Sequence, residues 1–514
     1  MMATVMTVIV VEMSPPGCDT LGSPTRLLPP PPDTGYEILV ATGSDGRVAV
    51  AERVNQLLMA AQGEYCLFLG HRVMITAALV AAHLVAQHAA GGAITIGSPA
   101  HEGSAGNAGP AIADCTGGNF SAPRAAILAA GGWARDLPLR EELDLAHRLH
   151  VAGLPIVIAP GATTQASRPA TGTDETAIAV GAADVDVYRR RPALLSYLPL
   201  GRFDDTSLRA LLLRRLLLTW HVPPSLLLRL MSAVKSRSWG REWDRFRREY
   251  HYWWGARRAM EHALWLRLSR GPVILMYHAF GPHGERPSRY IVPAERFARQ
   301  LAWLALCRYR VLGLDEVVAC RRAGRLLPPR TVVLTADDGY VDTLTVAAPL
   351  LRHRRFPATV FVVSDALGGT NDWDVDTLLT GRRIATAAAI RAVRCAGDIR
   401  FGAHTRHHPS LTAIASARAR EEIVGGRAAL EAALGEEVTM FAYPYGHYDA
   451  SGVALVEEAG YAGACGGFSG INDPGVPPYT LRRAEIRGTD SLFTFAMIVA
   501  CGRTRPLARL RGGR

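Results

Sequence analysis

Apolar runs of strand length alternate with helical stretches through the second part of the chain, from Gly271 onward. The runs read PVILMYH, TVVLTADDG, ATVFVV, DIRFGAH and VTMFAYPYG, and helical patterns such as Phe297, Leu301 and Leu304 lie between them. Repeated β/α units of this length favour a parallel sheet that closes into a barrel. We therefore predict a deformed (β/α) barrel over residues 270–502.

The first part of the chain shows a similar alternation in the runs TVIVV, YEILVA, EYCLFL, AITIGS and LPIVIA. This pattern predicts an open α/β sheet over residues 1–170. Residues 171–269 read as a helical connector, interrupted at Pro223–Pro224, and residues 503–514 form a basic C-terminal tail. A chain of 514 residues is too long for one ordinary core, which agrees with two domains and a connector.

The net charge of +11 raises the question of nucleic-acid binding. Lys235 is the only lysine, and the arginines are scattered along the chain without a basic stripe interleaved with aromatic residues. A protein that follows a phosphate backbone concentrates its positive charge on one face. We therefore expect no nucleic-acid partner.

The cysteines and the N-terminus favour a cytoplasmic location. Eight cysteines stand far apart without a CxxC pair, which is typical of reduced thiols. The N-terminal apolar run has no preceding positive charge and meets Glu12 early, so it reads as a strand and not as a secretory signal. The aromatic group at residues 250–254, which lies beside arginines, fits packing between domains, with peripheral association at the inner membrane face as the alternative.

Four polar residues follow two of the predicted barrel strands. Asp337 and Asp338 end TVVLTADDG, and His404 and His408 stand four residues apart after DIRFGAH. One carboxylate and two imidazoles are a sensible ligand set for a catalytic divalent ion, and the second aspartate is placed to hold or deprotonate a bound water. Zinc is the first choice, with cobalt, nickel, iron or manganese as alternatives.

Each half of this constellation also has an ordinary structural interpretation. Asp-Asp-Gly by itself is most often a turn, and two histidines four apart also occur as a helix cap and a surface residue. His407 shows that a histidine occurs here without a ligand role. The coincidence of both pairs at strand ends is what favours a site.

The segment from about Gly271 to Gly502 resembles the polysaccharide deacetylase family, carbohydrate esterase family 4, which includes chitooligosaccharide deacetylases. TADDG is similar to the family's Thr-Phe-Asp-Asp-Gly, which implies Asp337 as general base and Asp338 as metal ligand. HTRHH is similar to its His-Ser/Thr-x-x-His element, which implies His404 and His408 as the other ligands. FAYPYG resembles the motif in which the residue after proline, here Tyr445, offers its backbone N–H to the oxyanion.

The chain departs from the family pattern in two places. Ala442 stands where the family usually has an arginine, and the C-terminal Leu-x-His with the general acid is missing. PVILMYH resembles the opening strand of circularly permuted members, which implies His278 as the acid; a histidine that merely ends a strand is the alternative. Arg483 is the candidate to replace the missing arginine beside Asp337. The expected substrate-binding residues are Tyr443, Pro444, Trp373 and Arg483.

The resemblance implies metal-dependent hydrolysis of the N-acetyl group of an N-acetylhexosamine in a glycan, a lipid-linked sugar or a glycosylated metabolite, with release of acetate. Two other functions stay open: a bifunctional glycosyltransferase-deacetylase and a non-catalytic glycan-binding protein.

Residues 6–167 resemble, more loosely, a glycosyltransferase family 2 domain with a GT-A-like sheet. The carboxylates of that family are missing: Ala41 follows the second strand, and Gly70, His71 and Arg72 replace Asp-x-Asp. Glu142 stands at the place of the catalytic acid. Loss of the metal-binding carboxylates favours a degenerate domain that binds sugar or has a structural role.

Overall fold

The computed structural model describes residues 6–12, 36–42, 47–70, 75–97, 112–115, 118–137, 139–162, 174–232, 240–374, 378–395, 397 and 399–504. They form two compact units. Unit 1 comprises Met1–Leu200 and Leu217–Glu261, and unit 2 comprises Gly201–Leu216 and His262–Arg514. A short segment from the helical region therefore belongs to the C-terminal unit.

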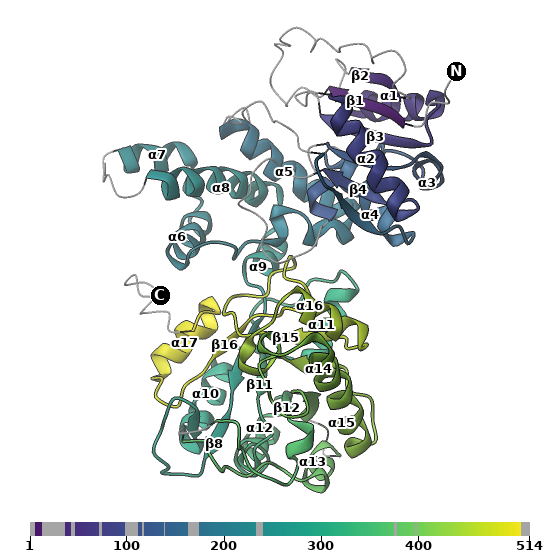
Figure 1. The fold of residues 1–514 in the computed structure, drawn as a ribbon. Coiled ribbons are helices and arrows are strands. Elements are labelled where there is room, and N and C mark those ends of the chain that lie inside the picture. Colours follow the sequence, from purple (N-terminus) through teal and green to yellow (C-terminus); the bar gives the residue numbers. More distant parts are fainter. Residues whose placement is uncertain are drawn as a thin grey trace. The chain divides into compact units, whose positions relative to one another are not determined.

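Unit 1 contains a six-stranded sheet in the order β2-β1-β3-β5-β4-β6 (Figure 1). The strands are β1 (Met6–Glu12), β2 (Tyr36–Thr42), β3 (Tyr65–Gly70), β4 (Ile94–Gly97), β5 (Phe120–Pro123) and β6 (Ile156–Ala159). β5 runs antiparallel to β3 and β4, and the other neighbours are parallel. The predicted open α/β sheet is confirmed, and β5 is a strand that the apolar pattern did not indicate.

Helices lie between these strands in the chain and follow them up to the start of the barrel. They are α1 (Arg47–Ala60), α2 (Ala77–Ala90), α3 (Arg124–Ala129), α4 (Glu141–Val151), α5 (Asp174–Arg190), α6 (Leu208–Thr219), α7 (Pro224–Ser232), α8 (Gly240–Ala259) and α9 (His262–Ser269). Tyr250, Tyr252 and Trp253 of α8 are buried, and the Tyr252 hydroxyl donates to Asp184 of α5 at 2.8 Å. These aromatic residues therefore pack within unit 1. Among the described helices, none is long and apolar enough to cross a bilayer.

Unit 2 is a nearly closed parallel barrel in the order β15-β14-β13-β12-β11-β7-β16. The strands are β7 (Val273–Tyr277), β11 (Thr331–Ala336), β12 (Ala358–Val362), β13 (Ile399–Ala403), β14 (Met440–Ala442), β15 (Gly463–Cys465) and β16 (Arg483–Glu485). The two ends of the sheet meet because Leu481 donates its N–H to Ala464 and accepts from Gly466, each at 2.9 Å. The predicted deformed (β/α) barrel is confirmed.

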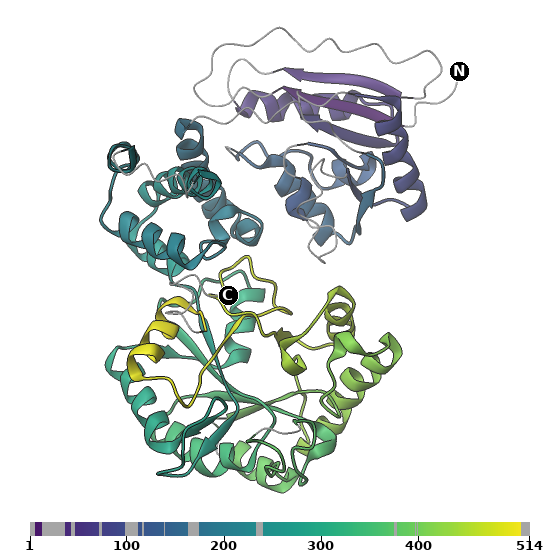
Figure 2. The same cartoon turned by 60° about the vertical axis from the view of Figure 1, so that its left-hand side comes forward.

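The barrel helices lie around the strands, as Figure 2 shows. They are α10 (Ala294–Leu306), α11 (Leu314–Arg322), α12 (Ala348–Arg354), α13 (Ala387–Arg394), α14 (Ser416–Arg420), α15 (Gly426–Leu434), α16 (Ala450–Glu458) and α17 (Leu492–Cys501). Leu275 packs in a core with Leu301 of α10, whereas its neighbour Ile274 packs with Phe361 and Met440 of other strands. The strands are thus buried on both faces, which explains their continuous apolar runs.

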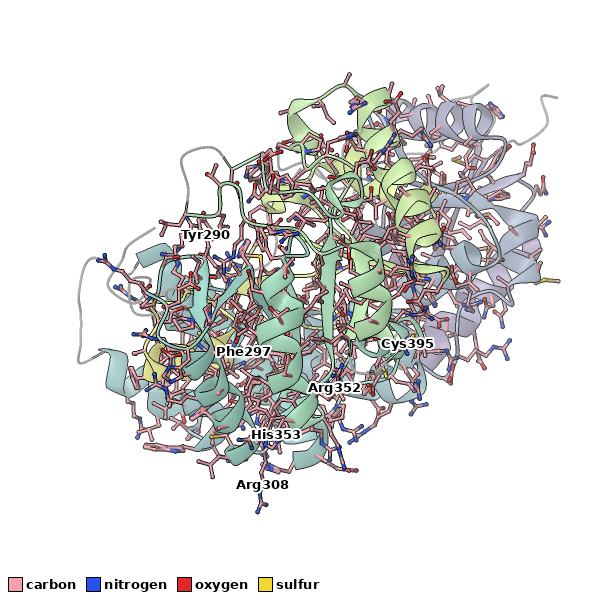
Figure 3. All side chains as sticks on the ribbon, turned by 90° about the horizontal axis from the view of Figure 1, so that it is seen from below. Tyr290, Phe297, Arg308, Arg352, His353 and Cys395 are labelled. Atoms are coloured by element: carbon pink, nitrogen blue, oxygen red, sulfur yellow. The ribbon has the colours of Figure 1, made fainter. Side chains whose placement is uncertain are left out.

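The barrel has two distinct ends. Three residues mark them: Tyr290, which precedes β9 (Ile291–Pro293), and Arg308 and His353, which lie before β10 (Arg310–Val311) and β12. Figure 3 shows Tyr290 at one end of the unit and Arg308 and His353 at the opposite end. The predicted site residues follow their strands and so belong to the end that holds Tyr290.

Candidate active site

The two carboxylates and two histidines come from loops directly after β11 and β13. Asp338 and His408 have positive φ angles of 71° and 62°, and Thr405 between the histidines has a φ of 65°. Such angles are uncommon for residues with a side chain and cluster at functional sites. The Thr405 hydroxyl accepts the His408 N–H at 3.0 Å, which holds this loop in its turned form.

Asp338, His404 and His408 converge on one point. The Nε2 atoms of His404 and His408 lie 3.2 Å apart and 3.7 and 3.5 Å from Asp338 Oδ1. The His404 Nδ1–H donates to the carbonyl of Ala442 at 2.8 Å, so its Nε2 keeps a lone pair that points at the cluster. Burial lowers the pKa of His404 to about 4 and of His408 to about 2, so both imidazoles are neutral at pH 7.

The carboxylate of this cluster also fits a cation. Burial, together with the charges of Asp337 and Asp374, raises the pKa of Asp338 well above its usual value. Tyr340 donates a hydrogen bond to it, but among the described residues no arginine or lysine forms an ion pair with it, and the two histidines beside it are neutral at pH 7. A divalent ion would restore its ionised form, so the chemistry of the donor set fits a metal.

Asp337 is held by a buried arginine. Arg483 of β16 donates from Nη1 to Oδ1 at 2.6 Å and from Nη2 to Oδ2 at 2.9 Å. Burial by itself would raise the pKa of Asp337, but Arg483, His404 and His278 outweigh it and lower the pKa to about 2. Asp337 is thus a carboxylate at any physiological pH, in a fixed orientation.

Tyr445 lines the same pocket and lies beside His408 of the cluster. Its φ is 57°, and its ring meets the His408 ring edge-on with the centroids 4.7 Å apart. Tyr443 and Pro444, expected at the substrate, are buried and do not line the pocket; the Tyr443 hydroxyl donates to the carbonyl of Tyr479. The left-handed turn at Tyr445 breaks the strand alternation, so the Tyr445 ring is half exposed at the pocket while Tyr443 lies in the core.

Trp373 is also outside the pocket lining. Its ring stacks on His408 with the centroids 4.9 Å apart and the planes at 30°. It therefore packs against a ligand candidate.

His278, the residue after β7, lines the pocket and is enclosed by protein. Its Nδ1 is buried and has no hydrogen-bond partner among the described residues, and its ring meets Tyr290 at 5.2 Å. Burial lowers the pKa of His278, while Asp337 and Glu485 act in the opposite direction. The structure therefore brings His278 into the same pocket as Asp337.

The pocket has a volume of about 500 Å³. It is lined by the cluster and by residues that sequence reasoning did not single out, namely Met276, Arg289, Tyr290, Asp374, Leu379, Gly446, His447, Gly467, Phe468, Ser469, Glu485 and Thr504. Most of these lie on loops without a recognisable motif. Among these residues, Glu485 was the easiest to predict from the sequence. It follows Arg483 by two residues, so the two side chains point to the same side of the strand.

In unit 1, the positions expected for transferase chemistry lie on different secondary-structure elements. Ala41 and Gly70 lie at the ends of β2 and β3, and Glu142 is in the first turn of α4. His71 and Arg72 lie outside the described residues.

Comparison with known proteins identifies the barrel region. The polysaccharide deacetylase family model matches residues 325–464. The poly-beta-1,6-N-acetyl-D-glucosamine N-deacetylase of Escherichia coli (strain K12) is 30% identical over 109 residues, which are 21% of this chain and 16% of that protein. YxkH of Bacillus subtilis (strain 168) is 23% identical over 188 residues, which are 37% of this chain and 61% of YxkH.

Two solved structures are also similar. The Streptococcus pyogenes deacetylase PplD is 22% identical, with a TM-score of 0.38, over 44% of this chain and 97% of PplD. IcaB from Ammonifex degensii is 24% identical, with a TM-score of 0.39, over 45% of this chain and 96% of IcaB. The chain spans less than two thirds of the curated relatives named above. The match over residues 325–464 places a domain of the polysaccharide deacetylase family in the C-terminal region of the chain.

Proposed function

We propose that unit 2 hydrolyses the N-acetyl group of an N-acetylhexosamine in a glycan, a lipid-linked sugar or a glycosylated metabolite, releasing acetate. One observation carries this proposal. A neutral His404/His408 pair and Asp338 converge within 3.7 Å, next to Asp337, which a buried Arg483 keeps ionised. A site for a Lewis acid beside a fixed base is what amide hydrolysis requires.

Asp338, His404 and His408 would hold a divalent cation, which when bound would supply Lewis acidity toward the acetamide carbonyl and the attacking water. Zinc suits two imidazoles and one carboxylate, and cobalt, nickel, iron or manganese are the alternatives. Asp337 takes the proton of the attacking water, since Arg483 holds both of its oxygens in place.

Two further residues complete the reaction. The backbone N–H of Tyr445 donates to the oxyanion, for which the left-handed turn at this residue sets its direction. His278 protonates the departing amine, because it lines the same pocket as Asp337 and its buried Nδ1 has no hydrogen-bond partner among the described residues.

Unit 1 has a separate role in this proposal. The glycosyltransferase-like pattern of residues 1–170 without its carboxylates supports sugar binding or a structural role in place of transfer. The widely spaced cysteines without a CxxC pair support a cytoplasmic substrate, with peripheral association at the inner membrane face as the alternative. A bifunctional transferase would instead turn over nucleotide sugars in a manner sensitive to Glu142→Gln.

Acetate release tests the proposal. The parent protein, treated with a chelator and then reloaded with zinc or cobalt, is incubated with N-acetylglucosamine oligomers and N-acetylglucosaminyl lipids. We expect release that needs the metal and that Asp338→Asn and Asp337→Asn each abolish. Retained ligand binding with no acetate from any of these sugars would favour the non-catalytic glycan-binding protein.

A further inference from the structure

A buried acid lies against the loop of the two ligand histidines and has no role in the proposed chemistry. Glu422 is fully buried in a π-helical turn (Glu421–Gly425) between α14 and α15. A carboxylate is seldom buried unless its oxygens are paired, because it gives up its hydration. π-Helical turns within α-helices also occur frequently at functional sites. The partners of Glu422 therefore indicate what this acid does.

Glu422 binds the backbone between the two ligand histidines. Its Oε2 accepts the N–H of Arg406 at 3.0 Å and the N–H of His407 at 2.9 Å. Its Oε1 lies 2.9 Å from His407 Nδ1 and 2.8 Å from Arg418 Nη2. One carboxylate thus satisfies two consecutive peptide groups of the ligand loop and is itself paired with a cation.

The same segment is held from its other side and closely packed. The Ser364 N–H, after β12, donates to the carbonyl of Thr405 at 3.2 Å. On the side of α15, a Cβ at Gly426 would lie 3.0 Å from the carbonyl carbon of Thr405, so the loop backbone rests directly on the helix. An apolar side chain in place of Glu422 would leave two peptide N–H groups of this packed segment without their acceptor.

This backbone sets the direction of the ligand side chains. Thr405 and His408 have left-handed φ angles of 65° and 62°, which persist only where the surrounding structure holds them. We propose that Glu422 is a positioning residue for the metal site, which keeps His404 and His408 in the arrangement that binds a divalent cation. Groups that orient metal ligands affect metal affinity without contacting the metal. This inference rests on the metal site of the proposed function.

The adjacent acid is a matched control. Glu421 precedes Glu422 in the same π-helical turn, but its side chain is 64% exposed and pairs with Arg418 at 3.1 Å. A change at Glu421 therefore removes a carboxylate from the same turn and leaves the hydrogen bonds to the ligand loop in place.

Zinc affinity of the full chain, measured by competition with a chromogenic chelator, tests the inference. Glu422→Met removes the acceptor and Glu422→Asp withdraws it by the length of one methylene, so each should weaken zinc binding by about 10- to 100-fold. Glu422→Gln, which keeps an oxygen for the two N–H groups, and Glu421→Met should both stay within about threefold of the parent. If Glu422→Met does not fold, Glu422→Asp decides the result.

The melting temperature of the metal-free protein separates positioning from a purely structural role. The inference is overturned if Glu422→Asp lowers this temperature but the folded variant binds zinc as tightly as the parent.

Acetate release separates the inference from the proposed function. If the parent binds zinc but releases no acetate, and Glu422→Asp still weakens zinc binding, the deacetylase proposal fails and the role of Glu422 stands. If the parent releases acetate and Glu422→Asp binds zinc normally, the reverse holds. A parent that binds no zinc contradicts both.

Discussion

Asp337 and Asp338 are adjacent in the chain, yet their surroundings move their pKa values in opposite directions. Burial and neighbouring carboxylates raise the pKa of Asp338, whereas Arg483 overcomes burial and lowers that of Asp337 to about 2. Asp337 is therefore ionised and holds no proton of its own, whereas Asp338 needs a nearby cation to stay ionised. Such divergence between neighbours is how two identical side chains acquire different roles.

The pH profile tests the part of Arg483. In Arg483→Met, the buried Asp337 loses its bidentate partner, so its pKa rises. Because the base must be ionised, kcat/KM should fall with decreasing pH at a higher pH than in the parent, and kcat at neutral pH should drop about 100-fold. Arg483→Lys should recover part of the loss. An unshifted acid limb in Arg483→Met would show that Arg483 does not act through Asp337.

Adjacent histidines provide a matched pair for the metal site. His408 belongs to the converging cluster, whereas His407 pairs with Glu422 at 2.9 Å and is half exposed. His408→Gln should weaken zinc binding by more than about 100-fold, and His407→Gln should leave it near the parent value. Competition with a chromogenic chelator measures both. Equal losses would mean that the zinc site is assembled elsewhere.

At the residue scale, the sequence predicted the residues that form compact motifs. Asp337, Asp338, His404 and His408 lie within two short segments, so their spacing was visible. Arg289 and Phe468 reach the pocket from loops whose path depends on the closed barrel, and the sequence pattern held no signal for them. The sequence pattern also did not predict that Tyr443 is buried, because its burial depends on the conformation of the loop after β14.

At the scale of elements, the loop after β14 depends on a glycine contact. Gly446 has a φ of 70°, and a Cβ there would lie 2.2 Å from Gly467 Cα. Gly446→Ala should therefore cost about 3 kcal/mol and lower activity by displacing Tyr445. Gly435 has a φ of 73° but nothing within 4 Å of its Cβ position, so Gly435→Ala should cost only about 1 kcal/mol. The melting temperatures of the two variants are compared by thermal unfolding. Similar losses of stability would argue against the close contact between Gly446 and Gly467.

The strands show the limit of sequence patterns. The long barrel strands were predicted because burial on both faces gives continuous apolar runs. β15 and β16 have three residues each, and β5 of unit 1 has four. Such short strands take their place from hydrogen bonds to neighbours distant in sequence. Of these short strands, β16 matters most for the site, because its pairing with β7 brings Arg483 to Asp337.

At the scale of the whole molecule, the units are not consecutive in sequence. Residues 201–216 belong to unit 2, where Asp204 accepts from the Ile471 N–H at 2.9 Å and from Arg503 at 3.0 Å. The Gly475 N–H donates to the Gly201 carbonyl at 2.8 Å. The sequence placed this segment in a helical connector, since its contacts lie more than 250 residues away.

These contacts predict a stability difference between neighbouring aspartates. Asp204 is fully buried, so Asp204→Ala removes the acceptor of the Ile471 N–H and the carboxylate partner of Arg503, and it should destabilise unit 2 by about 3 kcal/mol. Asp205 is exposed, and Asp205→Ala should change stability by less than about 0.5 kcal/mol. The free energy of unfolding of unit 2 is measured for both variants by chemical denaturation, with proteolysis of the unfolded barrel as the readout. Equal stability of the two variants would contradict the assignment of this segment to unit 2.

The most direct test of the central claim is acetate release by the full chain before chelation, after chelation and after zinc is restored, with an N-acetylglucosamine tetrasaccharide as substrate. The site predicts release that disappears with the metal, returns with it, and stays absent in Asp337→Asn although that variant still binds zinc. Release that survives chelation, or that Asp337→Asn retains in full, would contradict metal-assisted deacetylation at this pocket.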